Sequence, residues 1–236
     1  MKSGTLYLIP VTLGGDNLDV VLPKQVVDVA RQLDTFIVEN EKTARHFLSL
    51  LKPAKPIREL SLLTLNEHTS TKELPDLLAP LLDGRDVGLM SEAGCPGIAD
   101  PGADLVSLAH QKGVRVAPLV GPSSILLALM ASGMNGQHFA FLGYIPSGKT
   151  ERVQRLREIE KRSLVHHETQ IFIEAPYRNQ HLLQDILDSC QASTRLCIAC
   201  NLSLKDELIL SKTIAEWKKS PLPDLHKLPT IFLLLG

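Results

Sequence analysis

The chain has 236 residues, of which 44% are hydrophobic and 22% are charged, and its formal net charge is −1. This composition is typical of a globular protein with one large domain or two small ones. The near-zero net charge excludes a global field that favours nucleic acid or anionic membranes. Aromatic residues make up 4%, so extensive stacking platforms for bases are not expected. Any contact with nucleic acid must therefore come from a local patch.

Features of targeting and secretion are absent from the sequence. It contains no uninterrupted apolar run of about 18 residues, so no membrane span is expected. The N-terminal residues enter a strand pattern directly, so we expect no signal peptide. Four cysteines in a chain of this length do not make a disulfide framework. Together these features predict a cytoplasmic protein.

Short apolar runs alternate with segments of helical spacing through the first half of the chain. The runs predict strands at residues 5–11, 35–39, 59–65, 87–90 and 114–119. The spacing predicts helices at residues 20–33 (beginning at Pro23), 42–51, 73–82 and 102–112. This alternation is typical of a parallel α/β sheet.

A second unit begins near residue 120. We expect its strands at residues 139–142, 170–174, 195–199, 208–213 and 230–235, and its helices at residues 124–132, 152–162 and 176–190. The last strands follow one another without full helices between them, which predicts a mixed sheet. The chain is therefore predicted to form two α/β domains, residues 1–119 and 120–236, the first with a mostly parallel sheet and the second with a mixed sheet.

The segment 91–102 follows the predicted strand at 87–90 and contains three glycines and two prolines. These residues force a tight backbone path with few side chains over it. Asp100 and Pro101 are expected to begin the next helix as its N-cap and first residue, and Gly113 is expected to end it. Because open α/β sheets bind ligands at the carboxyl ends of their strands, this loop is a candidate ligand site.

Residues 143–150 fit the phosphate-binding pattern G-x-x-x-x-G-K-[ST], with a predicted strand before them and a helix after them. A phosphate-binding loop turns consecutive backbone N–H groups toward the phosphates. Pro146 has no N–H, and it lies in the middle of this segment. Nucleotide binding by a P-loop is therefore kept only as an alternative function.

Metal and redox motifs are weak. Cys197 and Cys200 form a lone C-x-x-C, with Cys190 as a possible third ligand and no evident fourth. A structural zinc site needs four ligands, and the pair lies in an apolar strand pattern, so we predict core packing and no metal site. His68 follows the carboxyl end of a predicted strand and is either a general base or a surface histidine.

Basic residues are concentrated in the predicted helix after Thr150. Val153, Leu156 and Ile159 recur at helical spacing and should face the core. This phase predicts that Arg152, Arg155 and Arg162 project outward. The row is either a solvated helix face or, with Lys149, a ridge that contacts phosphates.

In their order along the chain, five blocks resemble the tetrapyrrole methylase superfamily. They are residues 6–10 (L-Y-L-I-P), 91–96 (S-E-A-G-C-P), 100–102 (D-P-G), 121–124 (G-P-S-S) and 143–146 (G-Y-I-P). Within this superfamily the chain is most similar to the branch that methylates a cytidine ribose 2′-hydroxyl in small-subunit ribosomal RNA. The resemblance implies an S-adenosylmethionine-dependent methyltransferase with a cofactor cleft between two α/β domains, and a homodimer.

The resemblance also implies roles for individual residues. Those matching the cofactor blocks are Pro10, Gly14, Met90, Ser91, Glu92, Ala93, Gly94, Ile98, Ser123, Ser124, Asn201, Leu202, Pro229 and Thr230. A helix that begins near Ser123 and Ser124 would offer free N–H groups to the methionine carboxylate. A ribose hydroxyl is a weak nucleophile and benefits from a general base, for which Glu39 and His68 are the candidates. The basic stretch gives Lys149, Arg152 and Arg155 as candidate contacts to the RNA.

Several blocks depart from the ribosomal RNA branch. Residues 11–15 read V-T-L-G-G instead of T-P-I-G-N, residues 39–42 read E-N-E-K instead of E-D-T-R, and residues 199–204 read A-C-N-L-S-L instead of A-R-E-L-T-K. The cofactor blocks are kept better than the blocks for the acceptor. The sequence thus supports methyl transfer more strongly than it supports an RNA acceptor, and a non-catalytic S-adenosylmethionine-binding protein is a further alternative.

Overall fold

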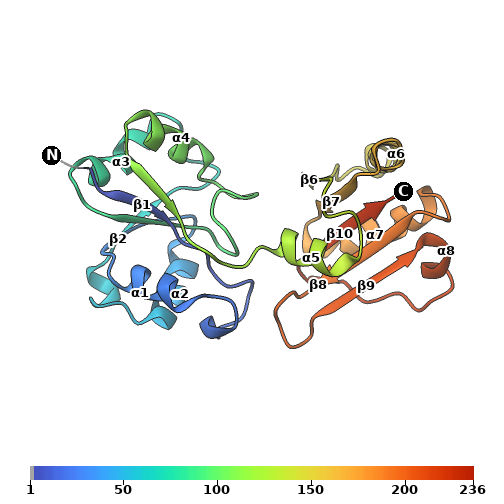
Figure 1. The fold of residues 1–236 in the computed structure, drawn as a ribbon, viewed down its shortest axis with the longest axis horizontal. Helices are drawn as coiled ribbons and strands as arrows, with labels where there is room; N and C mark the ends of the chain where they lie inside the picture. The colour runs from blue at the N-terminus through green and yellow to red at the C-terminus, as the bar shows by residue number, and fades with distance from the viewer. Residues whose placement is uncertain (1–2) are drawn as a thin grey trace. The chain divides into compact units, whose positions relative to one another are not determined.

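The computed structural model describes residues 3–236. The chain divides into two compact units, one that ends at Ser123 and one that begins at Ser124 (Figure 1). Each unit is built on its own five-stranded sheet. The prediction of two α/β domains is confirmed.

The N-terminal unit contains a fully parallel sheet in the order β3-β2-β4-β1-β5. Its strands are β1 (Thr5–Leu8), β2 (Thr35–Val38), β3 (Ser61–Thr64), β4 (Val87–Met90) and β5 (Arg115–Pro118). The central strands β2 and β4 are buried along their whole length. Both are apolar apart from Thr35, as expected for strands that are covered on both faces.

Helices cover both faces of this sheet (Figure 1). One core lies under α1 (Lys24–Arg31) and α2 (Glu41–Leu51) and includes Phe36 and Phe47. The other lies under α3 (Leu74–Leu82) and α4 (Ala103–Gln111) and includes Leu78 and Leu105. Adjacent strands β1 and β4 are thus followed by helices on opposite faces. In open α/β sheets a ligand crevice forms at such a switch point, outside the carboxyl ends of the two strands.

The C-terminal unit contains a mixed sheet in the order β6-β7-β10-β8-β9. Its strands are β6 (Phe139–Tyr144), β7 (Thr169–Ile173), β8 (Arg195–Cys200), β9 (Leu208–Thr213) and β10 (Thr230–Leu235). β6 and β7 are parallel, and the other neighbouring pairs are antiparallel. As a result, the carboxyl ends of β6, β7 and β8 lie at the same sheet edge as the start of β10.

The helices of this unit are α5 (Ser124–Ser132), α6 (Lys149–His166), α7 (Asn179–Ser189) and the short α8 (Ile214–Trp217). A single 3-10 turn, η3 (Pro176–Arg178), also lies in this unit, and two others, η1 (Leu18–Val20) and η2 (Ile57–Glu59), lie in the N-terminal unit. Phe172 and Phe232 stack in the core with ring centroids 6.1 Å apart. The Trp217 indole also reaches the core, where its Nε1 donates a 2.9 Å hydrogen bond to the Leu196 carbonyl.

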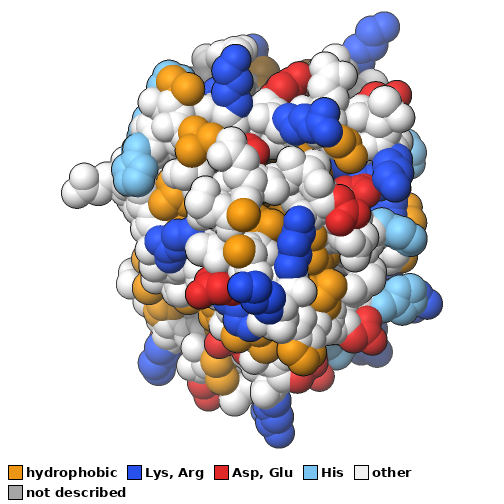
Figure 2. All heavy atoms as spheres, turned by 90° about the vertical axis from the view of Figure 1, so that its right-hand side faces the viewer, with side chains coloured by type: hydrophobic (Ala, Val, Ile, Leu, Met, Phe, Trp, Pro, Cys, Tyr) orange, Lys and Arg blue, Asp and Glu red, His pale blue; other side chains and the backbone are white. Residues whose placement is uncertain are grey.

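The surface carries charges of both signs. On the face drawn in Figure 2, Lys and Arg side chains are interspersed with acidic and apolar ones rather than gathered into one large basic field. This agrees with the net charge of −1. No helix within residues 3–236 combines the length and the apolar character needed to cross a membrane.

Candidate active site

Three segments meet at the carboxyl edge of the N-terminal sheet: residues 9–14 after β1, 91–102 after β4 and 119–123 after β5. The Val11 amide donates to the Gly94 carbonyl at 2.9 Å, and the Cys95 thiol donates to the Pro122 carbonyl at 3.3 Å. Gly121 packs so tightly on Pro10 that a Cβ there would lie 2.2 Å from the proline ring. These segments contain most of the N-terminal residues that the sequence assigns to the cofactor.

The glycines of the loop 91–102 are required by its backbone. Gly94 and Gly102 have φ angles of +72° and +136°, a region that side chains with a Cβ rarely adopt. A Cβ at Gly94 would meet only ordinary contacts, 3.4 Å from Leu13 and 3.5 Å from the Pro122 carbonyl. Its φ angle, and not a lack of space, therefore selects glycine at this position. Gly94 itself is buried, whereas Glu92 and Ala93 before it are exposed and leave their backbone open to a ligand.

The predicted start of the next helix is wrong. α4 begins at Ala103, and Gly102 occupies the N-cap position without a side-chain cap. The Asp100 carboxylate does not cap the helix; burial raises its pKa, and the nearby Ser91 side chain opposes this shift in part. The helix ends as predicted, since Gly113 follows it with a φ angle of +68°. Asp100 is thus turned toward the end of β4.

Glu39 follows the last residue of β2, beside β4, and it joins the same group of carboxylates. Burial raises its pKa, and the negative charges of Asp100 and Glu92 raise it further. A hydrogen bond from the Glu92 backbone N–H opposes this shift in part. Its Oε2 is buried and has no hydrogen-bond partner within residues 3–236. A carboxylate with a raised pKa and a free oxygen at a ligand crevice has the properties of a general base.

His68 lies at the exposed margin of this group, beside Glu67, whose negative charge also raises the pKa of Glu39. His68 follows the edge strand β3, its side chain is 83% exposed, and its Nε2 lies 3.6 Å from a carboxylate oxygen of the exposed Glu67. The structure places Glu39, and not His68, among Glu92 and Asp100. Of the two candidate bases, Glu39 has the geometry that the chemistry needs.

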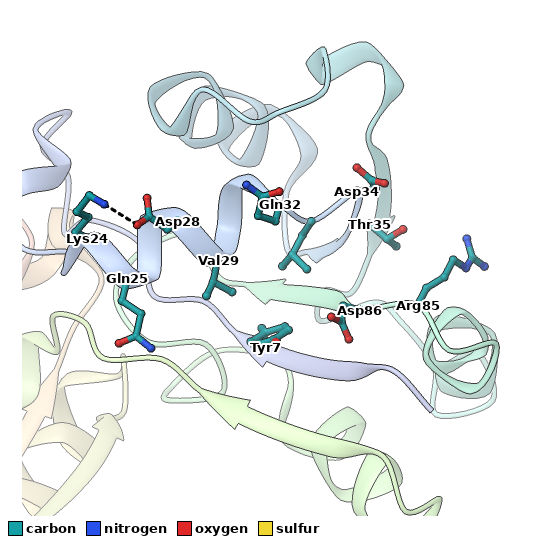
Figure 3. Close-up of a pocket in the computed structure, with 11 residues that line it drawn as sticks. Tyr7, Lys24, Gln25, Asp28, Val29, Gln32, Asp34, Thr35, Arg85 and Asp86 are labelled. Atoms are coloured by element: carbon teal, nitrogen blue, oxygen red, sulfur yellow. Dashed lines mark hydrogen bonds and ion pairs between the residues drawn. The ribbon is translucent and has the colours of Figure 1, made fainter. Parts of the chain in front are cut away.

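A separate cavity of about 730 Å³ lies along α1, whose side chains form one of its walls. Tyr7 lies in it, as do Thr35 and Asp86 at the amino ends of β2 and β4 (Figure 3). Lys24 there is paired with Asp28 at 3.0 Å. The cavity extends to the amino edge of the sheet, opposite the three loops, and includes none of the residues that the sequence assigns to the cofactor.

In the C-terminal unit, the two segments assigned to the adenine lie beside each other. The Asn201 amide donates to the Pro229 carbonyl at 3.0 Å, and Thr230 is paired in register with Cys200. Asn201 is buried, has a φ angle of +51°, and donates its side-chain amide to Asp206 at 2.6 Å. Its side-chain N–H is therefore already engaged within the unit.

The predicted outward projection of Arg152 is wrong. Its side chain is 7% exposed, and its Nε and Nη2 contact Asp185 at 2.8 and 2.6 Å. Its Nη1 donates to the Ser147 carbonyl at 2.6 Å. Arg152 therefore ties α6 to α7 and is not available to an RNA. Arg155 is half-buried, and its Nη1 lies 3.2 Å from a carboxylate oxygen of Glu158.

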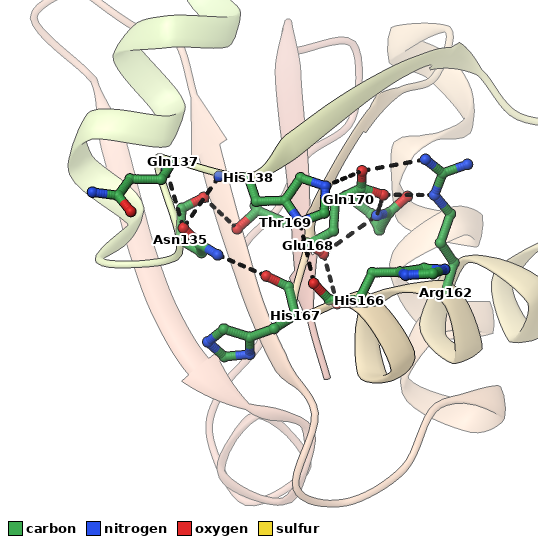
Figure 4. A network of polar contacts seen from close by, with 10 residues as sticks. Asn135, Gln137, His138, Arg162, His166, His167, Glu168, Thr169 and Gln170 are labelled. Atoms are coloured by element: carbon green, nitrogen blue, oxygen red, sulfur yellow. Dashed lines mark hydrogen bonds and ion pairs between the residues drawn. The ribbon is translucent and has the colours of Figure 1, made fainter.

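Arg162 also has a structural role (Figure 4). Its Nε and Nη2 donate to both oxygens of the buried Glu168, at 2.5 and 3.2 Å. Gln170 donates to the same carboxylate at 2.7 Å, and His138 lies 3.3 Å from it. The Arg162 and Gln170 hydrogen bonds are the main reasons that the pKa of Glu168 falls to about 2.

The residues 143–150 do not form a phosphate cradle. Gly148 is extended, with φ −71° and ψ 135°, and α6 begins only at Lys149. The Glu151 carboxylate folds back over the loop, so that a Cβ on Gly148 would lie 2.2 Å from its Oε2. An anionic side chain beside this loop opposes phosphate binding.

Sequence reasoning missed two groups of residues. Arg157 and Lys161 lie with Lys149 along one groove on α6, and their spacing from Lys149, at multiples of four, was the available signal. The second group comprises Tyr144, Glu174, Tyr177 and Arg178 at the carboxyl edge of the C-terminal sheet. Its signal was the run Glu-Ala-Pro-Tyr-Arg, residues 174–178, directly after β7.

Two solved structures share the fold. The structure of the methyltransferase CobJ matches with a TM-score of 0.64 and 15% identity, over all of this chain and 95% of that one. Uroporphyrin-III-C-methyltransferase from Thermus thermophilus matches with a TM-score of 0.56 and 16% identity, over all of this chain and 93% of that one. The model of the family Tetrapyrrole (Corrin/Porphyrin) Methylases matches residues 5–218.

Curated relatives are more similar in sequence. The Ribosomal RNA small subunit methyltransferase I of Vibrio cholerae is 34% identical over 213 residues, which is 89% of this chain and 69% of the relative. The protein of the same name from Pseudomonas aeruginosa is 33% identical over 216 residues, or 92% and 72%. The chain belongs to the tetrapyrrole methylase family. It is an S-adenosylmethionine-dependent methyltransferase.

Proposed function

We propose that the enzyme methylates a ribose 2′-hydroxyl of small-subunit ribosomal RNA. The observation that carries this proposal is the identity of about one third, over nine-tenths of the chain, to relatives named for small-subunit ribosomal RNA. The structure adds a carboxylate suited to activating a hydroxyl and a row of cations suited to a phosphate backbone. The proposal includes action in the cytoplasm, and the homodimer implied by the family resemblance stays a prediction.

The N-terminal crevice supplies the groups for the methyl donor. Its proposed contacts are Pro10, Gly14, Met90, Ser91, Glu92, Ala93, Gly94 and Ile98, together with Ser123. When bound, S-adenosylmethionine supplies a methyl group that its positive sulfonium already activates. The backbone around Gly94 lets the cofactor approach, and the carboxylates of Glu92 and Asp100 attract its positive charge. Ser124, Asn201, Leu202, Pro229 and Thr230 are the contacts proposed for the C-terminal unit.

Glu39 is the proposed general base. Its carboxylate accepts the proton of the ribose hydroxyl while the hydroxyl oxygen bonds to the methyl carbon. The bound donor would supply the methyl carbon and would keep the electron pair of the broken carbon–sulfur bond as a neutral thioether. Burial and the neighbouring Asp100 and Glu92 raise the pKa of Glu39 and make its carboxylate a stronger base than an exposed one.

The cationic row on α6 is the proposed contact with the RNA backbone. Lys149, Arg157 and Lys161 line one groove with Thr150, Val153, Gln154 and Glu158. All three cations are exposed, and within residues 3–236 none of them has an ion pair like the one between Arg155 and Glu158. Cations that face solvent without a counter-charge are suited to phosphates.

The direct test is methyl transfer from methyl-labelled S-adenosylmethionine to unmodified small-subunit ribosomal RNA. The product is digested to nucleosides and separated by mass. We expect one 2′-O-methylated nucleoside, no product with large-subunit RNA, and loss of product with Glu39→Gln. A label on a base, or no label on any ribosomal RNA although the cofactor binds, would contradict the proposal.

A further inference from the structure

The carboxyl end of β7 carries a buried ion pair that holds an arginine at the surface. Glu174 is 4% exposed, and its Oε1 accepts from the Ala175 amide at 2.7 Å and from Arg178 Nη2 at 2.6 Å. The Arg178 side chain remains 30% exposed. Within residues 3–236, the buried Glu174 Oε2 and Arg178 Nε have no hydrogen-bond partner. Glu174 therefore holds the guanidinium in place, and part of its surface remains exposed.

Two exposed tyrosines lie beside this guanidinium. Tyr177 is 58% exposed, its hydroxyl accepts from Arg178 Nη1 at 3.0 Å, and its ring centroid lies 5.1 Å from the guanidinium carbon. Tyr144 ends β6, is 64% exposed, and is paired in register with Ile173 next to Glu174. These are two of only three tyrosines in a chain with 4% aromatic residues. Two large exposed rings at one site indicate a ligand surface.

The chemistry of this group fits a base more closely than a phosphate. Glu174 neutralises Arg178, so the pair exerts little net attraction on an anion, unlike the unpaired cations of α6. Tyrosine rings and a partly exposed guanidinium plane provide flat faces on which bases can stack. Single-stranded RNA offers unstacked bases that can use such faces.

The position of the group agrees with a role near the acceptor nucleotide. In the register of the C-terminal sheet, Tyr144 is opposite Ile173, Ile173 is opposite Ile231, and Thr230 is opposite Cys200. Three strand spacings, about 14 Å, therefore separate Tyr144 from the end of β8. Asn201, which is assigned to the adenine of the methyl donor, follows that strand end. Lys149, which begins the cationic row, follows Tyr144 by five residues.

We propose that Tyr144, Tyr177 and Arg178 form a platform on which bases of the single-stranded RNA acceptor stack. The platform rests on the proposed function, because it names the part of the protein that holds bases of that RNA. It sorts the RNA contacts of this unit into two kinds. The platform holds bases, and the row on α6 holds phosphates.

The test compares full-length variants in binding to unmodified small-subunit ribosomal RNA transcribed in vitro. We expect Tyr144→Ala and Tyr177→Ala each to weaken RNA binding about 5- to 100-fold, as for other stacked bases. The dependence of affinity on salt should stay unchanged, because no phosphate contact is lost. Tyr177→Phe should keep the affinity, since it keeps the ring.

Phe139→Ala is the matched control, because Phe139 is an exposed aromatic residue at the other end of β6 and should not affect RNA binding. Thermal melting and S-adenosylmethionine titration of every variant check the fold and the donor site. Wild-type affinity in both alanine variants would overturn the platform and leave the proposed function intact. Loss of S-adenosylmethionine binding in them would overturn it by assigning the tyrosines to the donor. Failure of the wild-type protein to bind the RNA would instead contradict the proposed function.

Discussion

The carboxyl edges of the two sheets have opposite chemical characters. At the edge of the N-terminal sheet, glycine backbone and the carboxylates of Glu39, Glu92 and Asp100 predominate. At the corresponding edge of the C-terminal sheet and along α6, exposed tyrosines and the cations Lys149, Arg157 and Lys161 predominate. The fold class is the same, so the side chains at the strand ends decide what each unit can bind.

This difference matches the two proposed substrates. S-adenosylmethionine is compact and carries a positive sulfonium. A crevice lined by carboxylates attracts this charge. An RNA is long and anionic, and it needs cations at intervals and flat faces for its bases. A near-neutral chain can thus bind both, because carboxylates gather at the edge of the N-terminal sheet and unpaired cations gather on α6. The predictions below test this separation, beginning with the largest expected effect.

Replacing Gly94 should abolish donor binding. Gly94→Trp places a bulky side chain where the cofactor must approach, so we expect S-adenosylmethionine affinity to fall at least about 100-fold, or ~2.7 kcal/mol. Gly113→Trp is the matched control: its φ of +68° is nearly the same, and a Cβ there meets open space at the far end of α4. Both variants carry similar backbone strain, so equal losses of affinity in a calorimetric titration would remove Gly94 from the donor site.

Removing the proposed base should affect catalysis and not binding. Glu39→Gln is expected to lower kcat about 10²- to 10⁴-fold, the usual contribution of a general base, with S-adenosylmethionine affinity kept within about threefold. His68→Gln should leave kcat within about twofold, since the His68 side chain is 83% exposed and contacts the equally exposed Glu67. Single-turnover methyl transfer measures both effects. A large loss in His68→Gln and none in Glu39→Gln would exchange the two roles.

Two cations of α6, three residues apart, should separate stability from binding. Arg152→Ala strands the buried Asp185 charge and should lower the free energy of unfolding by about 3–5 kcal/mol. Lys149→Ala should change it by less than about 0.5 kcal/mol but reduce the salt slope of RNA binding by about one. Urea titrations and RNA binding at several salt concentrations give these values. A stable Arg152→Ala with weakened RNA binding would restore Arg152 as an RNA contact.

The smallest expected effect concerns pH. Glu39 must be ionised to accept a proton, and its pKa is raised above 4.5, so kcat/KM should fall as the pH drops through that raised value. Asp100→Asn removes a neighbouring negative charge and should move this acid limb to lower pH. The pH profile of single-turnover rates locates the limb in both proteins. A limb that stays in place, or moves to higher pH, would show that Asp100 does not tune the base.

Much of the fold is predictable because short buried strands and capped helices have local sequence patterns. All ten strands within residues 3–236 lie at predicted runs, and α5, β9 and β10 have the predicted bounds. Wrong or missing predictions have tertiary causes. Arg152 faces inward because Asp185, 33 residues away, receives it. Asp100 does not cap α4, because Gly102, with a φ angle of +136°, occupies the N-cap position. The four-residue α8 is too short to show a helical period.

The candidate site was only partly predictable. The glycine loop and the choice of Glu39 as a base came from sequence blocks, but the raised pKa of Glu39 depends first on its burial and then on carboxylates of the loop after another strand. The exposure of His68 likewise follows from its place beyond an edge strand. Tyr144 and Tyr177 come together only through the register of β6 and β7. Spatial pairing of distant segments is the information that local patterns lack.

The most direct test of the central claim is a calorimetric titration of the purified protein with S-adenosylmethionine, with ATP and magnesium as a parallel titrant. Saturable binding of S-adenosylmethionine without binding of ATP is the predicted result, because the N-terminal crevice suits the donor and residues 143–150 do not form a phosphate cradle. Binding of ATP without binding of S-adenosylmethionine would contradict both conclusions.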